Sequence, residues 1–295
     1  MKCVVIGGCN IDIFGSPLNK MIIHDSNPGS VKISVGGVGR NIAENMARLG
    51  IDVSMISAVG NDEFGKIVLD KLDSLRINRD NIFVSETHPT STYLCVLDSD
   101  REMHVAINSM DVIECVDENL IKNSILKEDI LLLDGNLSEE TLDYIFDNFE
   151  NKIVVDGVSS IKVVKFRKYL SKIHTLKLNE LEAKALIDHS DPIEIGRRLC
   201  ELGVSNVYIT LGERGAYYIS AQDSHGYNIT IKDIKNVTGA GDAFTAGIVY
   251  CLINGIDPKE TLKFSTYCAY MALQSIETIN NELSLEKILE LNKND

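Results

Sequence analysis

The stretch Asn236-Val237-Thr238-Gly239-Ala240-Gly241-Asp242-Ala243 is the most informative part of this chain. A helical pattern follows it at once, because residues 243, 244, 247, 248, 251 and 252 fall on one face and Gly255 closes the pattern. The N–H groups of Gly239 to Asp242 are therefore expected at a helix N-terminus, where unpaired donors and the helix dipole favour an anion. A carboxylate beside a bound anion suits phosphoryl transfer to a hydroxyl, in which the donors neutralise the moving phosphoryl group and the carboxylate takes the proton. The ordinary alternative is an acid in the first turn of a helix after a glycine turn.

Length and charge limit the classes of function. The chain has 295 residues and a formal net charge of −14, so a bulk attraction to nucleic acid or to an anionic membrane is not expected. No apolar run reaches the ~18 residues of a membrane span. The seven cysteines include no Cys-x-x-Cys pair and are interpreted as reduced, small core residues of a cytoplasmic protein.

Short β-branched runs alternate with helical patterns along the chain. Buried strands are predicted at residues 3–6, 53–58, 130–133, 153–155, 175–178 and 207–211. Helices are predicted at residues 41–49, 64–75, 118–126, 139–148, 180–187 and 193–202. The repeated strand–helix–strand order predicts an α/β fold with a mainly parallel sheet covered on both faces. No linker divides the chain, so we expect a single domain over residues 1–295.

Two segments interrupt this alternation. Residues 11–35 are loop-rich, and residues 91–107 hold two alternating runs around the turn Asp98-Ser99-Asp100-Arg101, which is typical of a hairpin. Together they are predicted to form a small β lid over the carboxyl edge of the sheet, where ligands bind in open α/β folds. An exposed lid hairpin offers unpaired backbone groups to a second subunit, which predicts a homodimer through the lid.

Polar residues after the first strand are candidates for substrate binding. Asn10 and Asp12 follow the carboxyl end of that strand, and their i, i+2 spacing directs both toward one cleft. An amide and a carboxylate are the groups that vicinal sugar hydroxyls require, although a solvated turn explains the pair equally well. The glycines of Gly36-Gly37-Val38-Gly39-Arg40-Asn41 let the backbone approach a ligand closely. This motif does not match a dinucleotide-binding fingerprint.

Two junctions in the second half of the chain are candidates for nucleotide binding. Asn179 and Glu182 stand three apart at a strand-to-helix junction, which suits either water-mediated Mg²⁺ binding or a helix cap. The turn Thr210-Leu211-Gly212-Glu213-Arg214-Gly215 joins two strands and leaves room for a ribose or adenine, or is a simple hairpin. The stretch from Gly60 to Lys66 imitates a P-loop but carries two acids where phosphate should lie, so it is rejected.

These motifs, taken as an ordered set, resemble the ribokinase (PfkB-type) family of carbohydrate and nucleoside kinases. The resemblance covers nearly the whole chain, and its most specific element is Gly239-Ala240-Gly241-Asp242. It implies a ribokinase-like three-layer α/β/α sandwich with a small β lid. It also implies ATP as phosphoryl donor, Mg²⁺ as cofactor and a small nucleoside or sugar as substrate. Ribokinases usually carry Lys and Ala where Val38 and Arg40 stand, so the chain resembles ribokinases themselves less than it resembles another branch.

The resemblance also implies roles for residues. It makes Asp242 the catalytic base, with Gly239, Ala240 and Gly241 as the anion hole. Groups implied to hold the substrate are Asn10, Asp12, Gly37, Asn41 and, near the place where ribokinases carry a sugar-contacting acid, Asn136. Groups implied to hold ATP and its Mg²⁺ are Asn179, Thr210, Gly212, Gly215 and Glu182, the last of which would hold Mg²⁺ through water.

Three points stay open in the sequence. Many potassium-activated relatives carry Asp where Asn236 stands, so activation by a monovalent cation is open. Asn108 and Asp111, just after the predicted hairpin, are candidates to read a polar group of the substrate, and surface or core roles explain them equally well. A nucleoside kinase, a ribokinase or broader sugar kinase, and a non-catalytic sensor on the same fold remain the alternatives. The retained Asp242 and the intact Gly-Ala-Gly argue against the sensor.

Overall fold

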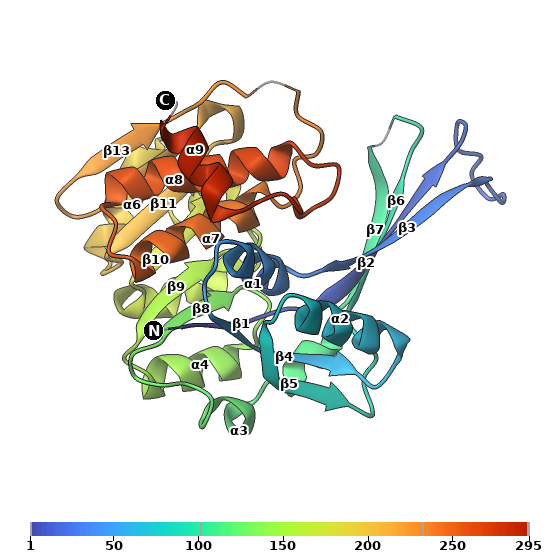
Figure 1. Ribbon diagram of the computed structural model, residues 1–295, viewed down its shortest axis with the longest axis horizontal. Coiled ribbons are helices and arrows are strands. Elements are labelled where there is room, and N and C mark those ends of the chain that lie inside the picture. The colour runs from blue at the N-terminus through green and yellow to red at the C-terminus, as the bar shows by residue number, and fades with distance from the viewer. Residues whose placement is uncertain (1, 101, 232, 294–295) are drawn as a thin grey trace.

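A computed structural model describes residues 2–100, 102–231 and 233–293 of the chain. Its main element is a nine-stranded sheet with the order β13-β12-β11-β10-β9-β8-β1-β4-β5 (Figure 1). The strands, in chain order, are β1 (Cys3–Ile6), β4 (Val53–Gly60), β5 (Asn78–Ser85), β8 (Ile130–Asp134), β9 (Lys152–Asp156), β10 (Thr175–Asn179), β11 (Asn206–Thr210), β12 (Ala216–Ile219) and β13 (Ser224–Tyr227). All pairings from β5 to β11 are parallel, whereas β12 and β13 are antiparallel. The carboxyl ends of seven strands therefore meet at one edge.

Helices cover both faces of this sheet because its strands are apolar on both sides. In β1, Val4 and Ile6 pack into one core, and Cys3 and Val5 pack into the other. The first core is closed by α4 (Glu139–Asn148), α5 (Glu180–Leu186), α6 (Pro192–Glu201) and a 3-10 segment, Val163–Lys172. The second is closed by α1 (Val38–Arg48), α2 (Glu63–Ser74), α7 (Ala240–Ile253), α8 (Pro258–Leu273) and α9 (Leu285–Lys293). The result is the three-layer α/β/α sandwich that the sequence predicts.

The lid is a separate four-stranded sheet that projects from one side of the sandwich (Figure 1). Its order is β3-β2-β6-β7, with β2 (Asn10–Pro17), β3 (Gly29–Gly36), β6 (Thr92–Leu97) and β7 (Met103–Ser109). The hairpin predicted over residues 91–107 forms β6 and β7, and the loop-rich segment 11–35 is in fact mostly β2 and β3. These strands escape notice because their facing ends, Gly15-Ser16-Pro17 and Gly29-Ser30, contain glycine and proline, which are depleted in strands.

Some elements differ from the sequence prediction. The helix expected over residues 118–126 ends early, as α3 (Glu118–Ile121), because the Ser124 hydroxyl bonds the carbonyl of Leu120 and Asp129 accepts from the N–H of Leu126. The sequence pattern does not predict β5, β13, α8 or α9. Among the described residues, no helix is long and apolar enough to cross a membrane. The seven cysteines are all free thiols.

Candidate active site

The first turn of α7 presents a set of backbone N–H donors. Gly239 caps this helix in the left-handed conformation, with φ +85°. A side chain there would clash with the chain as well, since a Cβ atom would lie 2.1 Å from the carbonyl oxygen of Thr278. Within the described residues, no side chain caps this turn. Because the donors of Ala240, Gly241 and Asp242 are left for another partner, the turn is suited to an anion.

Asp242 stands on this first turn with its carboxylate directed inward. Its Oδ2 accepts a hydrogen bond of 2.8 Å from Nδ2 of Asn41, at the start of α1. Desolvation and, to a smaller extent, the charge of Asp156 raise the pKa of Asp242 to about 7, although Asn41, Lys177 and Arg40 act to lower it. A carboxylate whose pKa lies near neutrality is suited to accept and release a proton at physiological pH.

A buried ion pair between Lys177 and Asp156 lies next to the first turn of α7. Nζ of Lys177 on β10 lies 3.2 Å from Oδ2 of Asp156 at the end of β9, and both side chains are almost fully buried. The same Asp156 oxygen accepts a bond of 2.7 Å from the Thr245 hydroxyl on α7. A methyl group on Gly241 would lie 2.9 Å from Lys177 Nζ, so the ammonium lies directly beneath the donor turn. Sequence reasoning missed both charged residues, although a lysine between Leu176 and Leu178 of a buried strand is itself a signal.

Asn10 and Asp12 lie together on the lid strand β2. Asn10 Nδ2 donates to Asp12 Oδ1 at 2.6 Å, so the i, i+2 pair does share one face. Desolvation raises the pKa of Asp12, whereas the bond from Asn10 and the charge of Arg40 lower it. Tyr93 on β6 is the register partner of Asp12, and its ring meets Phe14 edge to face at 6.2 Å between centroids. The face that carries Asp12 therefore also presents two aromatic rings.

Asn108 lies on β7, an edge strand of the lid sheet, and Asp111 follows that strand. Asn108 on β7 is the register partner of Tyr93, so it shares the face that carries Asp12, and it is exposed. Asp111 opens a short 3-10 helix, Asp111–Cys115, and is also exposed. Neither residue has a core role, which was one of the alternatives for them.

The glycine motif before α1 is held by a carboxylate that sequence reasoning did not identify. Asp134, buried at the end of β8, accepts bonds of 2.8 Å from the N–H of Gly8 and 2.9 Å from that of Gly39. It also accepts from the N–H of Asn136 at 2.8 Å. The Asn136 side chain in turn accepts from Lys162 Nζ at 2.6 Å. Gly37 and Asn136 are thereby positioned at the same edge of the sheet.

Asn179 and Glu182 form a complete capping box at the start of α5. The Asn179 side chain accepts from the N–H of Glu182 at 2.9 Å, and the buried Glu182 carboxylate accepts from both the N–H and the side chain of Asn179. Oxygen donors of this kind fit Mg²⁺ that retains its waters. Among residues 2–100, 102–231 and 233–293, no cluster of three or more His, Cys, Asp or Glu is arranged to hold a metal alone. A divalent cation here would thus need ligands from a bound phosphate.

The remaining candidates for ATP binding lie where β11 turns into β12. Thr210 ends β11, and its hydroxyl donates to the carbonyl of Leu178 at 3.3 Å. Gly212 begins a single 3-10 turn, and Gly215 ends it, both with positive φ. This turn follows the carboxyl end of β11, so it shares the sheet edge with Asn179.

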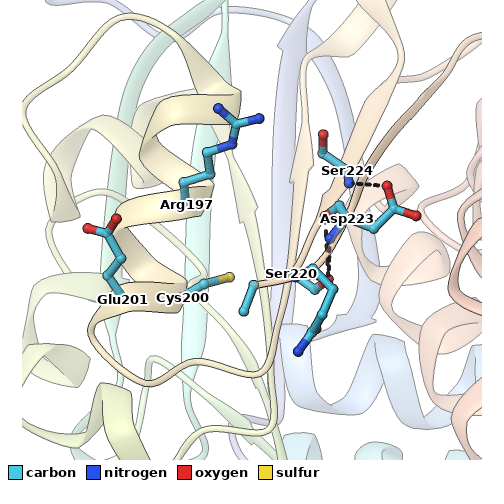
Figure 2. Close-up of a pocket in the computed structure, with 8 residues that line it drawn as sticks. Arg197, Cys200, Glu201, Ser220, Asp223 and Ser224 are labelled. Atoms are coloured by element: carbon cyan, nitrogen blue, oxygen red, sulfur yellow. Dashed lines mark hydrogen bonds between the residues drawn. The ribbon is translucent and has the colours of Figure 1, made fainter.

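A groove elsewhere on the surface is separate from this edge of the sheet. It measures about 510 Å³ and lies between α6 and the turn after β12, where Arg197, Cys200 and Glu201 face Ser220 and Asp223 (Figure 2). Because β12 runs antiparallel to β11, this turn lies at the opposite edge of the sheet from Asp242. The groove therefore takes no part in the candidate site.

Comparison with known proteins agrees with this arrangement. The model of the pfkB family carbohydrate kinases matches residues 1–285. The chain is 36% identical to the pseudouridine kinase of Escherichia coli, over 99% of this chain and 96% of that protein. It is 29% identical to the guanosine-inosine kinase of Exiguobacterium acetylicum, over 94% and 95% of the two chains. Arabidopsis thaliana ribokinase, solved with ribose and ATP, superimposes with a TM-score of 0.85 at 20% identity and covers 99% and 98% of the two chains.

Proposed function

The chain belongs to the pfkB family of carbohydrate kinases, and we propose that it phosphorylates the 5′-hydroxyl of pseudouridine, giving pseudouridine 5′-phosphate and ADP. As a member of this family it is a phosphotransferase that acts on a hydroxyl group of a sugar or nucleoside. The observation that carries the reaction type is Asp242, a carboxylate with a pKa near 7 on the uncapped first turn of α7. The observation that supports the substrate is the identity of 36% over nearly the full length of both chains.

In the proposed reaction, Asp242 accepts the proton of the 5′-hydroxyl as its oxygen attacks the γ-phosphorus. The bond from that phosphorus to the leaving oxygen of ADP breaks as the new ester bond forms. The first-turn N–H groups of α7 stabilise the charge on the moving phosphoryl group. Asp12, with Asn10 and Asn41 nearby, holds the ribose hydroxyls and orients the attacking oxygen.

ATP and Mg²⁺ are the proposed cofactors. Asn179, Thr210 and the Gly212–Gly215 turn would hold the nucleotide, and Glu182 would hold Mg²⁺ through water. When bound, the cation would neutralise phosphate charge. Asn236 uses its side-chain oxygen to accept from the N–H of Thr238 at 3.0 Å. It brings no negative charge to a monovalent cation, so strong potassium activation is not part of this proposal.

Substrate choice tests this proposal. The C-linked base of pseudouridine presents a ring N–H that uridine lacks, and Asn108 and Asp111 are the candidate acceptors. Both residues are exposed, so the two substrates differ by the extra hydrogen bond itself, which is worth ~0.5–1.5 kcal/mol, or roughly 2- to 13-fold. We expect kcat/KM for pseudouridine to exceed that for uridine by a factor in this range, and to exceed that for ribose.

The measurement is ADP release in a coupled assay with pseudouridine, uridine, guanosine, inosine and ribose. Equal or greater efficiency with ribose would replace the proposed substrate by a sugar. Binding of a nucleoside or sugar without turnover of any compound would instead favour a sensor. Asn108→Ala should narrow the ratio of kcat/KM between pseudouridine and uridine, and Asn119→Ala, at an exposed asparagine on α3, is the control.

We also propose that two copies of the chain associate through the lid. Register places Val31, Ile33, Leu94, Val105 and Ile107 on one face of the lid sheet, opposite to the face of Asp12. These residues are between 38% and 71% exposed, so β3, β6 and β7 present apolar side chains to solvent on this face. A second lid, apolar in the same way, would cover it.

The double variant Ile33→Asp/Ile107→Asp is expected to be monomeric, because it places two charges within that apolar face. Light scattering coupled to size exclusion measures the mass. Leu181→Asp, at an equally exposed apolar position on α5, should leave the dimer intact. A monomeric wild-type chain at micromolar concentration would contradict the dimer without affecting the kinase proposal.

A further inference from the structure

Arg40 is an arginine that the candidate site contains but the proposed reaction does not use. It is the third residue of α1 and is 1% exposed, which is rare for an arginine. Its guanidinium donates to the side chains of Asn41 and Glu44 and to the carbonyl oxygens of Val35 and Gly36. A charge this deeply buried requires a partner for nearly every donor, and Arg40 has them.

The bond to Asn41 has a direct consequence for Asp242. Arg40 Nη2 donates to Asn41 Oδ1 at 2.5 Å, while Asn41 Nδ2 donates to Asp242 Oδ2 at 2.8 Å. The carboxylate attracts the amide N–H₂ and Arg40 attracts the amide oxygen, so both groups favour the same orientation of the Asn41 side chain. Arg40 therefore reinforces the amide orientation in which Asn41 donates to Asp242.

The two carbonyl bonds connect the same guanidinium to the root of the lid. Val35 and Gly36 are the last residues of β3, and they pair with Ile11 and Asn10 on β2. Asp12, two residues beyond Asn10, is one of the carboxylates whose charge acts on Arg40, and Asp242 is another. One cation thus contacts the lid root and Asn41 and lies close to both carboxylates of the site.

We propose that Arg40 is a positioning residue, which fixes the Asn41 amide and the lid root around Asp242 and supplies the positive charge shared by Asp12 and Asp242. This role rests on the proposed phosphotransfer reaction. It makes Arg40 necessary for catalysis although it does not touch the reacting atoms.

A purely structural role is the competing explanation. Arg40 pairs with the buried Glu44, which also binds Arg48 Nη2 at 2.8 Å and Lys71 Nζ at 3.2 Å. Arg48 belongs to the same network on the same helix, but its other bonds go to Asn281, away from Asn41. Arg48→Met is therefore a matched control that weakens the ion-pair network and leaves the Asn41–Asp242 pair in place.

The test compares Arg40→Met, Arg40→Lys and Arg48→Met with the wild type. For each, kcat and KM with pseudouridine and ATP, the pH dependence of kcat/KM, and the melting temperature are measured. The other charged groups that face Asp242 are Asp156 on β9 and Lys177 on β10, and they are the same in all four proteins. Any difference in the pH profile then reflects Arg40.

We expect kcat to fall about 100-fold in both Arg40 variants, which is the cost of a misplaced catalytic group. The acidic limb of the profile should move to higher pH in Arg40→Met, because loss of the cation raises the pKa of Asp242. The acidic limb should keep its position in Arg40→Lys, because lysine keeps the positive charge although it lacks the planar guanidinium and its several N–H donors. Arg48→Met should keep the wild-type kcat and profile.

A wild-type kcat and pH profile in a folded Arg40→Lys or Arg40→Met, with only a lower melting temperature, would overturn the proposal and leave Arg40 structural. If Arg40→Met does not fold, the kcat of Arg40→Lys alone tests the role of Arg40: a wild-type kcat would overturn the proposal, and a fall of about 100-fold would support it. An inactive wild type would overturn the proposed function together with this role. An active wild type with unaffected Arg40 variants would overturn this role alone.

Discussion

Replacing Asp242 by asparagine is expected to lower kcat by ~10²–10⁴-fold, the usual contribution of a general base. Asparagine keeps the shape of the side chain but does not accept the hydroxyl proton. Because the pKa of Asp242 is about 7, the carboxylate is the larger fraction only above that pH. Wild-type kcat/KM should therefore fall as the pH drops below about 7, and this acidic limb should be absent from the residual activity of Asp242→Asn. Steady-state kinetics between pH 5 and pH 9 measure both effects.

Asp191→Asn is the control for an acid at a helix terminus. Asp191 caps α6 with its side chain, and asparagine caps equally well, so this variant should keep the wild-type kcat. Near wild-type kcat in Asp242→Asn would remove Asp242 from the mechanism and return it to an ordinary first-turn acid.

Removal of the Asp12 carboxylate has the second largest expected effect. If Asp12 binds ribose hydroxyls through charge-assisted bonds, each worth ~1.5–3 kcal/mol, Asp12→Ala should raise KM for the nucleoside by roughly 10- to 150-fold. Its melting temperature should stay close to that of the wild type, because the half-buried carboxylate is already costly to desolvate. KM is measured for pseudouridine and for ATP separately, and only the former should change.

Asp25→Ala provides the lid control for this result. Asp25 is an exposed residue of the β2–β3 loop, and its carboxylate accepts a hydrogen bond from the N–H of Ser26. Its loss should leave both KM values unchanged. An unchanged KM for every nucleoside and sugar in Asp12→Ala would mean that Asp12 is only a turn residue.

The central layers of the fold could be predicted from the sequence because their strands are apolar on both sides. The strand at residues 3–6 and the helix at residues 139–148 are found with the predicted bounds. β5 was hidden because only Ile82 and Ser85 of this edge strand are buried. In α8, buried hydroxyl residues such as Thr261, Ser265 and Thr266 interrupt the apolar pattern that marks a helix.

The candidate site was predictable where its chemistry depends on local sequence. The Gly239–Asp242 turn and the Asn179–Glu182 pair are local, so spacing alone placed them at helix starts. Contacts between distant parts of the chain were not predictable, because Asn41 and Asp242 are 201 positions apart and Asp134 and Gly39 are 95 apart. The spacing of residues also does not predict buried ion pairs such as that of Lys177, because its partner, Asp156, comes from another strand.

The most direct test of the account is the ³¹P NMR spectrum, with proton coupling, of the product formed from pseudouridine and ATP with Mg²⁺. The account predicts a new phosphate ester whose phosphorus couples to the two protons on the 5′ carbon, formed by the wild type and not by Asp242→Asn over the same time. No ester, or an ester whose phosphorus couples to a single ring proton, would contradict it.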